Sequence, residues 1–146
     1  MPELIKRGQE LELEIESLAY GGMGIARKGN FVIFVKNAIP GQKVFARIYK
    51  KRKGYAEANV YKILEESPFV EKVRCNHYYI CSKIQNLSYS KQVLEKSNQV
   101  EDAFRRLGGF SDFKLSDIIK SDVIFNYRNK MEFTFSPNRW VLETEP

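Results

Sequence analysis

Residues 10–16 read Glu-Leu-Glu-Leu-Glu-Ile-Glu, a strict alternation of acidic and aliphatic side chains. Successive side chains of a β-strand point to opposite faces, so Leu11, Leu13 and Ile15 share one face and the glutamates share the other. The stretch therefore predicts a strand with one buried face and one face in water.

The rest of the first half continues as short strands separated by glycine-rich turns. Residues 19–26 form a glycine-rich connection, and Lys28-Gly29-Asn30 predicts a tight hairpin turn because glycine and asparagine tolerate a positive φ. Further strands are predicted at residues 31–35, which are apolar on both faces, at 44–50 and at 55–63. Short strands at this spacing, without a helical period, indicate a small closed β-barrel of the oligonucleotide-binding kind.

The pattern changes after residues 65–68, Glu-Glu-Ser-Pro. Apolar residues recur at helical spacing from residue 90 to 107, and Gly108-Gly109 supplies a stop, so we predict one amphipathic helix. Its apolar face would carry Val93, Ser97, Val100, Phe104 and Leu107. Short strands are expected at 118–119, 123–127 and 131–135, around a turn at Arg128-Asn129.

These patterns divide the chain into two parts. Residues 1–64 are predicted to form the β-barrel, and residues 65–146 a small α+β domain.

The composition excludes several classes of protein. With 43% hydrophobic and 29% charged residues, the chain has too much apolar content to be wholly disordered. No run approaches the roughly 18 consecutive apolar residues of a membrane span, and the N-terminus lacks the apolar core of a signal peptide. We therefore expect a folded cytoplasmic protein without a membrane partner.

The net charge of +6 is concentrated in the first part of the chain. Residues 1–64 hold 12 basic and 6 acidic side chains, whereas residues 65–146 hold 12 of each. Residues 25–62 alone carry 10 Lys and Arg against a single acid, Glu57. This excess favours a polyanionic partner.

Cations and aromatic rings are interleaved near the end of this basic stretch. Clustered cations attract phosphates with release of counterions, and aromatic faces stack on bases at roughly 1–3 kcal/mol each. We predict a nucleic-acid-binding surface; the alternatives are a solvated edge hairpin kept soluble by lysines, with its aromatics in the core, or a surface that binds acidic partners nonspecifically. The predicted residues are Arg47, Tyr49, Lys50, Lys51, Arg52, Lys53 and Tyr55.

Two cysteines, Cys75 and Cys81, are too few for a disulfide framework. With His77 between them they could bind a metal, but an iron–sulfur cluster usually takes four protein ligands. Two ordinary thiols are the simpler interpretation of these residues alone.

An ordered series of motifs along nearly the whole chain resembles the RNA uracil-5-methyltransferases of ribosomal and transfer RNA. The first motifs resemble the TRAM domain at the front of that family, and the later ones resemble its central domain. Glycine corners alone are a weak signal, but the series ends in the specific motif Tyr-Arg-Asn-Lys at residues 127–130. The matching stretches are residues 13–26, 34–35, 38–42, 67–68, 75–81, 84–89, Gln92, Lys96 and 127–133.

The resemblance implies a five-stranded TRAM barrel that helps to hold RNA, followed by part of an α+β central domain that also contacts RNA. It adds Arg128, Asn129 and Lys130 to the candidate RNA-binding residues. In the family, a further Rossmann-like domain binds S-adenosylmethionine and carries the catalytic cysteine. Nothing in residues 1–146 resembles that domain, so we expect no catalytic residue and no S-adenosylmethionine site in this chain.

Many family members also hold a four-iron cluster, through a motif of which Cys75 and Cys81 are a remnant. Here Cys81 is followed by Ser-Lys-Ile-Gln at residues 82–85, where the family has Gly-Gly-Cys, so the third cysteine is absent. We therefore expect no iron–sulfur cluster in this chain.

The sequence thus predicts the RNA-binding front of an RNA uracil-5-methyltransferase, whose C-terminal methyltransferase domain is the missing partner. The alternative is a stand-alone RNA-binding or RNA-chaperone module.

Overall fold

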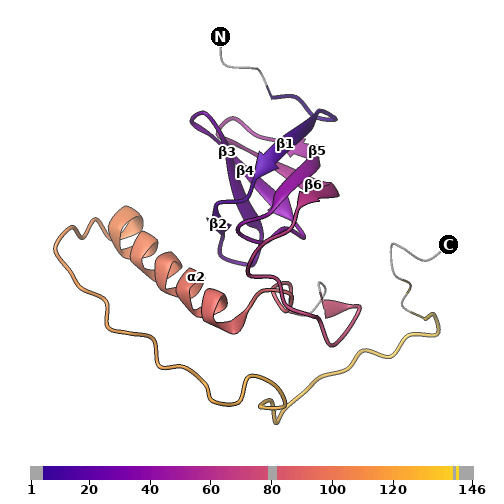
Figure 1. The fold of residues 1–146 in the computed structure, drawn as a ribbon, viewed down its shortest axis with the longest axis vertical. Helices are drawn as coiled ribbons and strands as arrows, with labels where there is room; N and C mark the ends of the chain where they lie inside the picture. Colours follow the sequence, from indigo (N-terminus) through magenta and orange to yellow (C-terminus); the bar gives the residue numbers. More distant parts are fainter. Residues whose placement is uncertain (1–4, 79–81, 140, 142–146) are drawn as a thin grey trace.

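The computed structural model describes residues 5–78, 82–139 and 141. Figure 1 shows three parts in chain order: a curled β-sheet, a helix beside one end of the sheet, and a long segment without regular structure that returns past the helix. The protein is therefore mostly sheet, with one long helix.

Six strands form one mixed sheet: β1 (Glu10–Glu14), β2 (Ser17–Leu18), β3 (Gly24–Lys28), β4 (Phe31–Lys36), β5 (Lys43–Lys51) and β6 (Tyr55–Glu65). Their order is β1-β5-β6-β4-β3-β2. β4 and β6 are parallel, and the other neighbouring strands are antiparallel.

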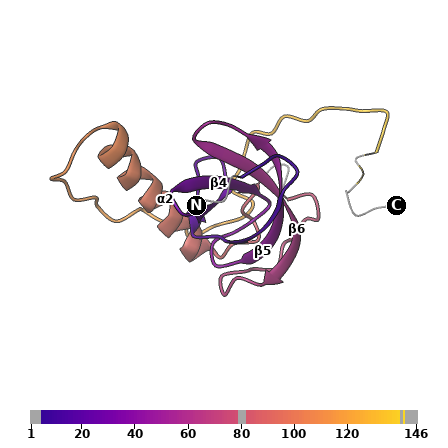
Figure 2. The ribbon, with the colours of Figure 1, turned by 90° about the horizontal axis from the view of Figure 1, so that it is seen from above.

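The two edge strands, β1 and β2, follow one another with only Ile15 and Glu16 between them. Ile15 N–H donates to the Gln42 carbonyl at 2.9 Å, and Glu16 N–H donates to the Ile25 carbonyl at 2.8 Å. The chain crosses here from β5 to β3, so the sheet curls around its core, as Figure 2 shows. The strand pairing does not give the expected closed five-stranded barrel. Six strands form an open sheet, because the ladder of β1 stops at Glu14 and β2 is only two residues long.

The core lies inside the curl. Leu11, Leu13 and Ile15 are buried and the glutamates between them are exposed, as the alternation predicts. Gly24 has no room for a side chain, because a Cβ there would lie 2.8 Å from Ile15 Cγ2. The same cluster contains Ile5, Ala26, Ile33, Val35, Ala38, Val44, Ala46, Ile48, Ala56 and Ala58.

Helix α2 (Tyr89–Asp102) continues as the π-helical turn η1 (Ala103–Leu107), so the helix predicted at 90–107 is confirmed. The face that it turns toward the sheet is not the predicted one. Glu95 is 2% exposed, whereas Val100 and Phe104 of the predicted apolar face are each 44% exposed.

A polar contact explains this orientation of α2. Leu18 N–H in β2 donates to Glu95 Oε2 at 2.8 Å, and the Leu18 carbonyl accepts from Gln99 Nε2 at 3.0 Å. Lys91 Nζ lies 2.9 Å from Glu95 Oε1, so the buried carboxylate has a cationic partner. The helix thus satisfies backbone groups of an edge strand, which would otherwise lack partners. We call Leu18, Glu95 and Gln99 the Leu18 clamp.

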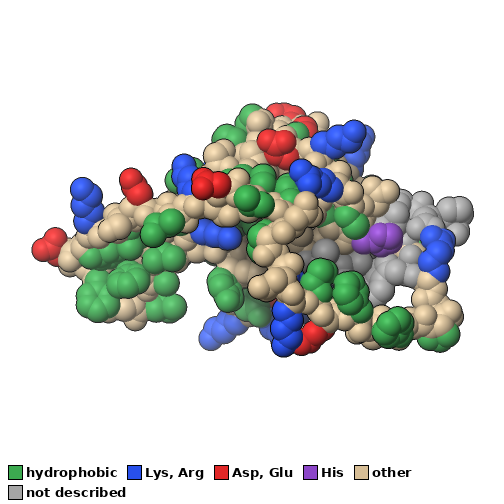
Figure 3. All heavy atoms as spheres, turned by 90° about the horizontal axis from the view of Figure 1, so that it is seen from below, with side chains coloured by type: hydrophobic (Ala, Val, Ile, Leu, Met, Phe, Trp, Pro, Cys, Tyr) green, Lys and Arg blue, Asp and Glu red, His purple; other side chains and the backbone are tan. Residues whose placement is uncertain are grey.

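Beyond η1, the described residues from 108 to 139 form no helix or strand. The strands predicted at 118–119, 123–127 and 131–135 are therefore wrong. A strand needs a neighbour for its backbone groups, and this segment runs apart from the six strands (Figure 1). Figure 3 shows apolar side chains gathered at the far end of α2, where the Phe104 ring packs on those of Phe110 and Phe113. None of the described helices has the length and hydropathy of a membrane span.

Candidate nucleic-acid interface

Three neighbouring strands present aromatic and charged side chains on the outside of the curled sheet. Along β4, Ile33 and Val35 are buried in the core, so Phe34 and Lys36 between and beyond them point outward. β6 pairs with β4 and β5 pairs with β6, so their outward side chains extend the same surface. We call this surface the outer face; it comprises Phe34, Lys36, Tyr49, Tyr55 and Glu57.

The aromatic rings of the outer face are held by their neighbours. The rings of Phe34 and Tyr55 meet edge to face, with centroids 5.6 Å apart and planes at 76°. Lys36 Nζ lies 4.6 Å from the centroid of the Tyr49 ring, within cation–π range. All three rings are half-buried, so each is fixed on one side and keeps some surface for a ligand.

Glu57, the single acid of residues 25–62, is bound by two of the predicted RNA-binding residues. Tyr49 Oη donates to Glu57 Oε2 at 2.6 Å, and Lys50 Nζ donates to Glu57 Oε1. The hydrogen bonds from Lys50 and Tyr49 lower the pKa of Glu57, and the bond to Glu57 raises the pKa of Lys50. Lys50 is therefore charged but already paired, which reduces the charge that it can offer to a phosphate.

Tyr49 is expected to titrate well above an ordinary tyrosine. Burial, and after it the hydrogen bond to Glu57, raises the pKa of Tyr49 from 10.0 to about 12. Because folding raises this pKa, Tyr49 stabilises the fold below pH 10, and that contribution is lost between pH 10 and about 12. The measurement is phenolate absorbance as a function of pH. The curve of the wild type minus that of Tyr49→Phe is expected to show the ionisation of Tyr49, with a pKa of about 12. Glu57→Gln keeps Tyr49 buried, so it should lower the pKa of Tyr49 only in part. A wild-type Tyr49 that ionises at the ordinary tyrosine pKa would contradict the burial and the hydrogen bond described above.

The loop between β5 and β6 presents its cations to solvent. Lys51, Arg52 and Lys53 are exposed and have no ion pair within the described residues, and the Arg52 N–H donates to the Tyr55 carbonyl at 2.8 Å. Arg47 is exposed further back on β5. All the residues predicted on the barrel therefore lie on one hairpin, formed by β5, the loop and the start of β6.

The second predicted group, Arg128, Asn129 and Lys130, lies elsewhere. These residues are exposed in the irregular segment, and no hairpin turn forms there because the flanking strands are absent. Lys130 Nζ lies 3.6 Å from Glu132 Oε1, an exposed pair. The structure does not bring this group to the outer face, so its part in RNA binding stays a prediction.

The cysteine motif is only partly described. Cys75 is exposed, and its N–H and that of Arg74 both donate to Gln85 Oε1, at 3.3 and 2.8 Å. Cys81 lies outside the described residues. Within the described ranges, no group of three or more His, Cys, Asp or Glu side chains could hold a metal ion.

Sequence reasoning missed Phe34 and Lys36 as candidate binding residues. The strand predicted at 31–35 could have indicated them, because its outward side carries an aromatic side chain. Such a ring is either covered by another part of the protein or free to contact a ligand. The Leu18 clamp gave no signal, since Glu95 stands among the polar positions of the predicted helix.

A curled β-sheet with cations and half-exposed rings on one strand surface has the features of an oligonucleotide-binding domain. The comparison with known families agrees with this class, because residues 5–61 match the TRAM domain.

Similar proteins extend the match beyond the sheet. A protein of Bacteroides thetaiotaomicron named as an uncharacterized RNA methyltransferase is 42% identical over 130 residues, which are 88% of this chain and 29% of that protein. One from Aquifex aeolicus with the same description is 34% identical over 135 residues, 91% of this chain and 32% of that protein. The solution structure of a conserved protein of Methanococcus maripaludis is 34% identical, with a TM-score of 0.38, over 40% of this chain and 83% of that one.

Residues 5–61 thus match the TRAM domain, and most of the chain is similar to one part of proteins named as RNA methyltransferases, in agreement with the resemblance of its motifs. The chain spans less than a third of the length of the two RNA methyltransferases described above, so the match concerns this part of those proteins.

Proposed function

We propose that this chain binds single-stranded RNA across the outer face and the loop at residues 51–53. The observation that carries the proposal is the placement of three half-exposed rings, those of Phe34, Tyr49 and Tyr55, beside exposed cations. Phosphates need nearby positive charge and bases need a flat apolar surface, and one side of the sheet offers both. The match to the TRAM domain and the similarity to proteins named as RNA methyltransferases support RNA as the ligand.

The chemistry of binding follows from these contacts. Lys51, Arg52 and Lys53 attract the phosphates, and the rings stack on bases. Glu57 holds Tyr49 in place before RNA arrives, so less ordering is needed on binding. A surface that engages backbone and base faces, rather than base edges, is expected to show weak sequence preference.

We further propose that the complete protein is an S-adenosylmethionine-dependent RNA (uracil-5-)methyltransferase that modifies ribosomal or transfer RNA in the cytoplasm. The motif at residues 127–133 supports this reading. Residues 1–64 would be the TRAM domain and residues 65–146 part of the central domain. A C-terminal domain outside this chain would bind S-adenosylmethionine and supply the catalytic cysteine.

On this proposal the chain by itself binds RNA but does not transfer a methyl group. Cys75 and Cys81 match the cluster motif of the family and not its nucleophile. No four-iron cluster is expected, because the motif lacks its third cysteine after Cys81.

Removing the ring of Phe34 is expected to weaken RNA binding about tenfold, because one stacked base contributes roughly 1–3 kcal/mol. The measurement is fluorescence anisotropy of a labelled single-stranded oligoribonucleotide with the wild type and Phe34→Ala. Phe34→Leu keeps apolar packing without a ring and should bind as weakly, whereas Phe34→Tyr keeps the ring and should bind normally.

Two results would contradict these expectations. Wild-type affinity in both Phe34→Ala and Phe34→Leu would remove Phe34 from the interface. A wild-type chain that binds no RNA at low salt would overturn the proposed function itself.

A further inference from the structure

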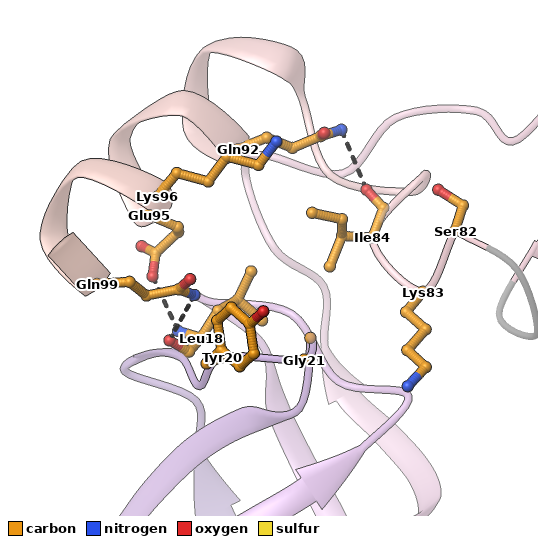
Figure 4. Close-up of a pocket in the computed structure, with 11 residues that line it drawn as sticks. Leu18, Tyr20, Gly21, Ser82, Lys83, Ile84, Gln92, Glu95, Lys96 and Gln99 are labelled. Atoms are coloured by element: carbon orange, nitrogen blue, oxygen red, sulfur yellow. Dashed lines mark hydrogen bonds between the residues drawn. The ribbon is translucent and has the colours of Figure 1, made fainter. Parts of the chain in front are cut away.

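A hollow of about 300 Å³ lies where the sheet meets helix α2. Three segments line it: the loop after β2, the loop before α2, and α2 itself (Figure 4). The volume is at the low end of the range of roughly 300–1,000 Å³ for small-molecule sites. It suits one small ligand unit and not a long peptide. The lining residues that carry the argument are Leu18, Tyr20, Lys83, Glu95, Lys96 and Gln99.

The walls of the hollow are fixed by hydrogen bonds. The Leu18 clamp joins β2 to the middle of α2. At the first turn of the helix, Gln92 Nε2 donates to the Ile84 carbonyl at 3.1 Å and to the Leu87 carbonyl at 2.7 Å. Leu18 and Leu87 are buried together, with Ile84 packed against them, so the floor is apolar. The site is therefore preformed, which lowers the entropy cost of binding.

The loop after β2 places an aromatic ring at the rim of the hollow. Ala19 N–H donates to the Met23 carbonyl at 2.8 Å, and Gly22 N–H donates to the Ala19 carbonyl at 3.0 Å. Gly22 has a φ of +84°, and a Cβ there would lie 3.2 Å from the Lys83 Cβ, so only glycine allows this approach. Tyr20 is left 95% exposed, as a flat surface with nothing packed on it.

Two cations also line the hollow. Lys83 and Lys96 are exposed, lie on different walls of the hollow, and form no ion pair within the described ranges. Glu95 does not cancel them, because its carboxylate is buried and already bonded to Leu18 N–H and Lys91 Nζ. The open mouth of the hollow is therefore positively charged, while its floor is apolar.

We propose that this hollow binds one unpaired nucleotide of the RNA, with the base against Tyr20 and its phosphates between Lys83 and Lys96. The inference rests on the proposed RNA-binding function and adds a second contact point. The hollow lies at the Gly24 end of β3, whereas the loop at 51–53 lies at the Lys28 end. A five-residue strand is roughly 16 Å long. The RNA therefore runs along the sheet from the basic loop to the helix.

The test compares two triple variants of the whole chain in anisotropy titrations with a labelled oligouridylate. The first combines Tyr20→Ala, Lys83→Ala and Lys96→Ala. It is expected to bind at least about tenfold more weakly, and its plot of log K against log salt should be flatter by about 1.4, since two phosphate contacts are lost. The matched control, Phe135→Ala with Lys114→Ala and Lys120→Ala, removes one exposed ring and two exposed cations from the irregular segment and should bind as the wild type does.

A second measurement locates the contact directly. RNA containing 4-thiouridine, crosslinked to the wild-type chain by light, is expected to mark the peptide that holds Tyr20. The proposed nucleotide site in the hollow would be contradicted by wild-type affinity and salt slope in the first triple variant, or by crosslinks confined to β4 to β6. Either result would leave the proposed function intact. Absence of any RNA binding by the wild type would overturn both. All three substituted side chains are exposed, so an unchanged melting temperature is expected. If the melting temperature of the first triple variant falls, the crosslinking experiment on the wild-type chain decides whether the hollow contacts RNA.

Discussion

Replacing Lys51, Arg52 and Lys53 together with alanine is expected to weaken RNA binding about 100-fold at roughly 0.1 M salt. Each cation that neutralises a phosphate of a single strand adds about 0.7 to the slope of log K against log salt, so three contacts account for about 2. The measurement is the dissociation constant at several salt concentrations. Adding Lys50→Ala should change little more, because Lys50 is already paired with Glu57.

The control for net charge is the triple variant Lys72→Ala, Lys114→Ala and Lys120→Ala, which removes the same number of exposed cations from outside the sheet. It should keep the wild-type salt slope. Glu57→Gln should act in the opposite direction and tighten binding, because it removes the single acid of the outer face and releases Lys50. Equal losses of RNA affinity in the two triple variants would mean that only total charge matters. An unchanged salt slope in the loop variant would exclude residues 51–53 from the RNA interface.

The sheet could be predicted from the sequence because its signals are local. The alternation at residues 10–16 fixed which side chains enter the core, and the glycines marked the corners. The closure of the sheet could not be predicted, since it depends on where the ladder of β1 ends. That end is set by hydrogen bonds from Ile15 N–H to the Gln42 carbonyl, just before β5, and from Glu16 N–H to the Ile25 carbonyl in β3.

The candidate site was predicted in part, for similar reasons. A run of cations within a few residues is visible in the sequence, so the loop at 51–53 could be predicted as an exposed basic segment. Phe34 and Lys36 join that loop through the parallel pairing of β4 with β6, which no local pattern reveals. The pairing of Lys50 with Glu57 is likewise a contact across two strands.

The second half of the chain shows what local patterns cannot decide. The helical period was sufficient to predict α2 and η1, but the helix turns Glu95 and Gln99, and not its apolar stripe, toward the sheet. The predicted strands at 118–135 have the right composition but no neighbouring strand to pair with. Strand formation depends on a partner, whereas helix formation does not.

Glu95→Ala is expected to detach helix α2 from the sheet while leaving the sheet folded. The change leaves Leu18 N–H and the Lys91 ammonium without their carboxylate partner, and breaking a buried pair in this way costs roughly 3–5 kcal/mol. Little apolar contact compensates, because Val100 and Phe104 face away from the sheet. Amide hydrogen exchange should show α2 losing protection, while the amides of β4 and β5 keep theirs.

Matched variants separate the clamp from helix propensity and from charge. Glu101→Ala removes an exposed carboxylate from the same helix, where it pairs with Arg105 at 2.9 Å, and should cost no more than about 0.5 kcal/mol. Glu95→Gln keeps an acceptor for Leu18 N–H but gives up the charge that faces Lys91, so its effect should be intermediate.

If α2 stays protected in Glu95→Ala, the apolar contacts of Leu18 and Leu87 hold the helix instead of the clamp. If protection is lost as predicted, the clamp also maintains the hollow beside Tyr20, because the same bonds fix its wall. Glu95→Ala should then weaken RNA binding as much as the triple variant of the hollow does, although Glu95 itself touches no RNA.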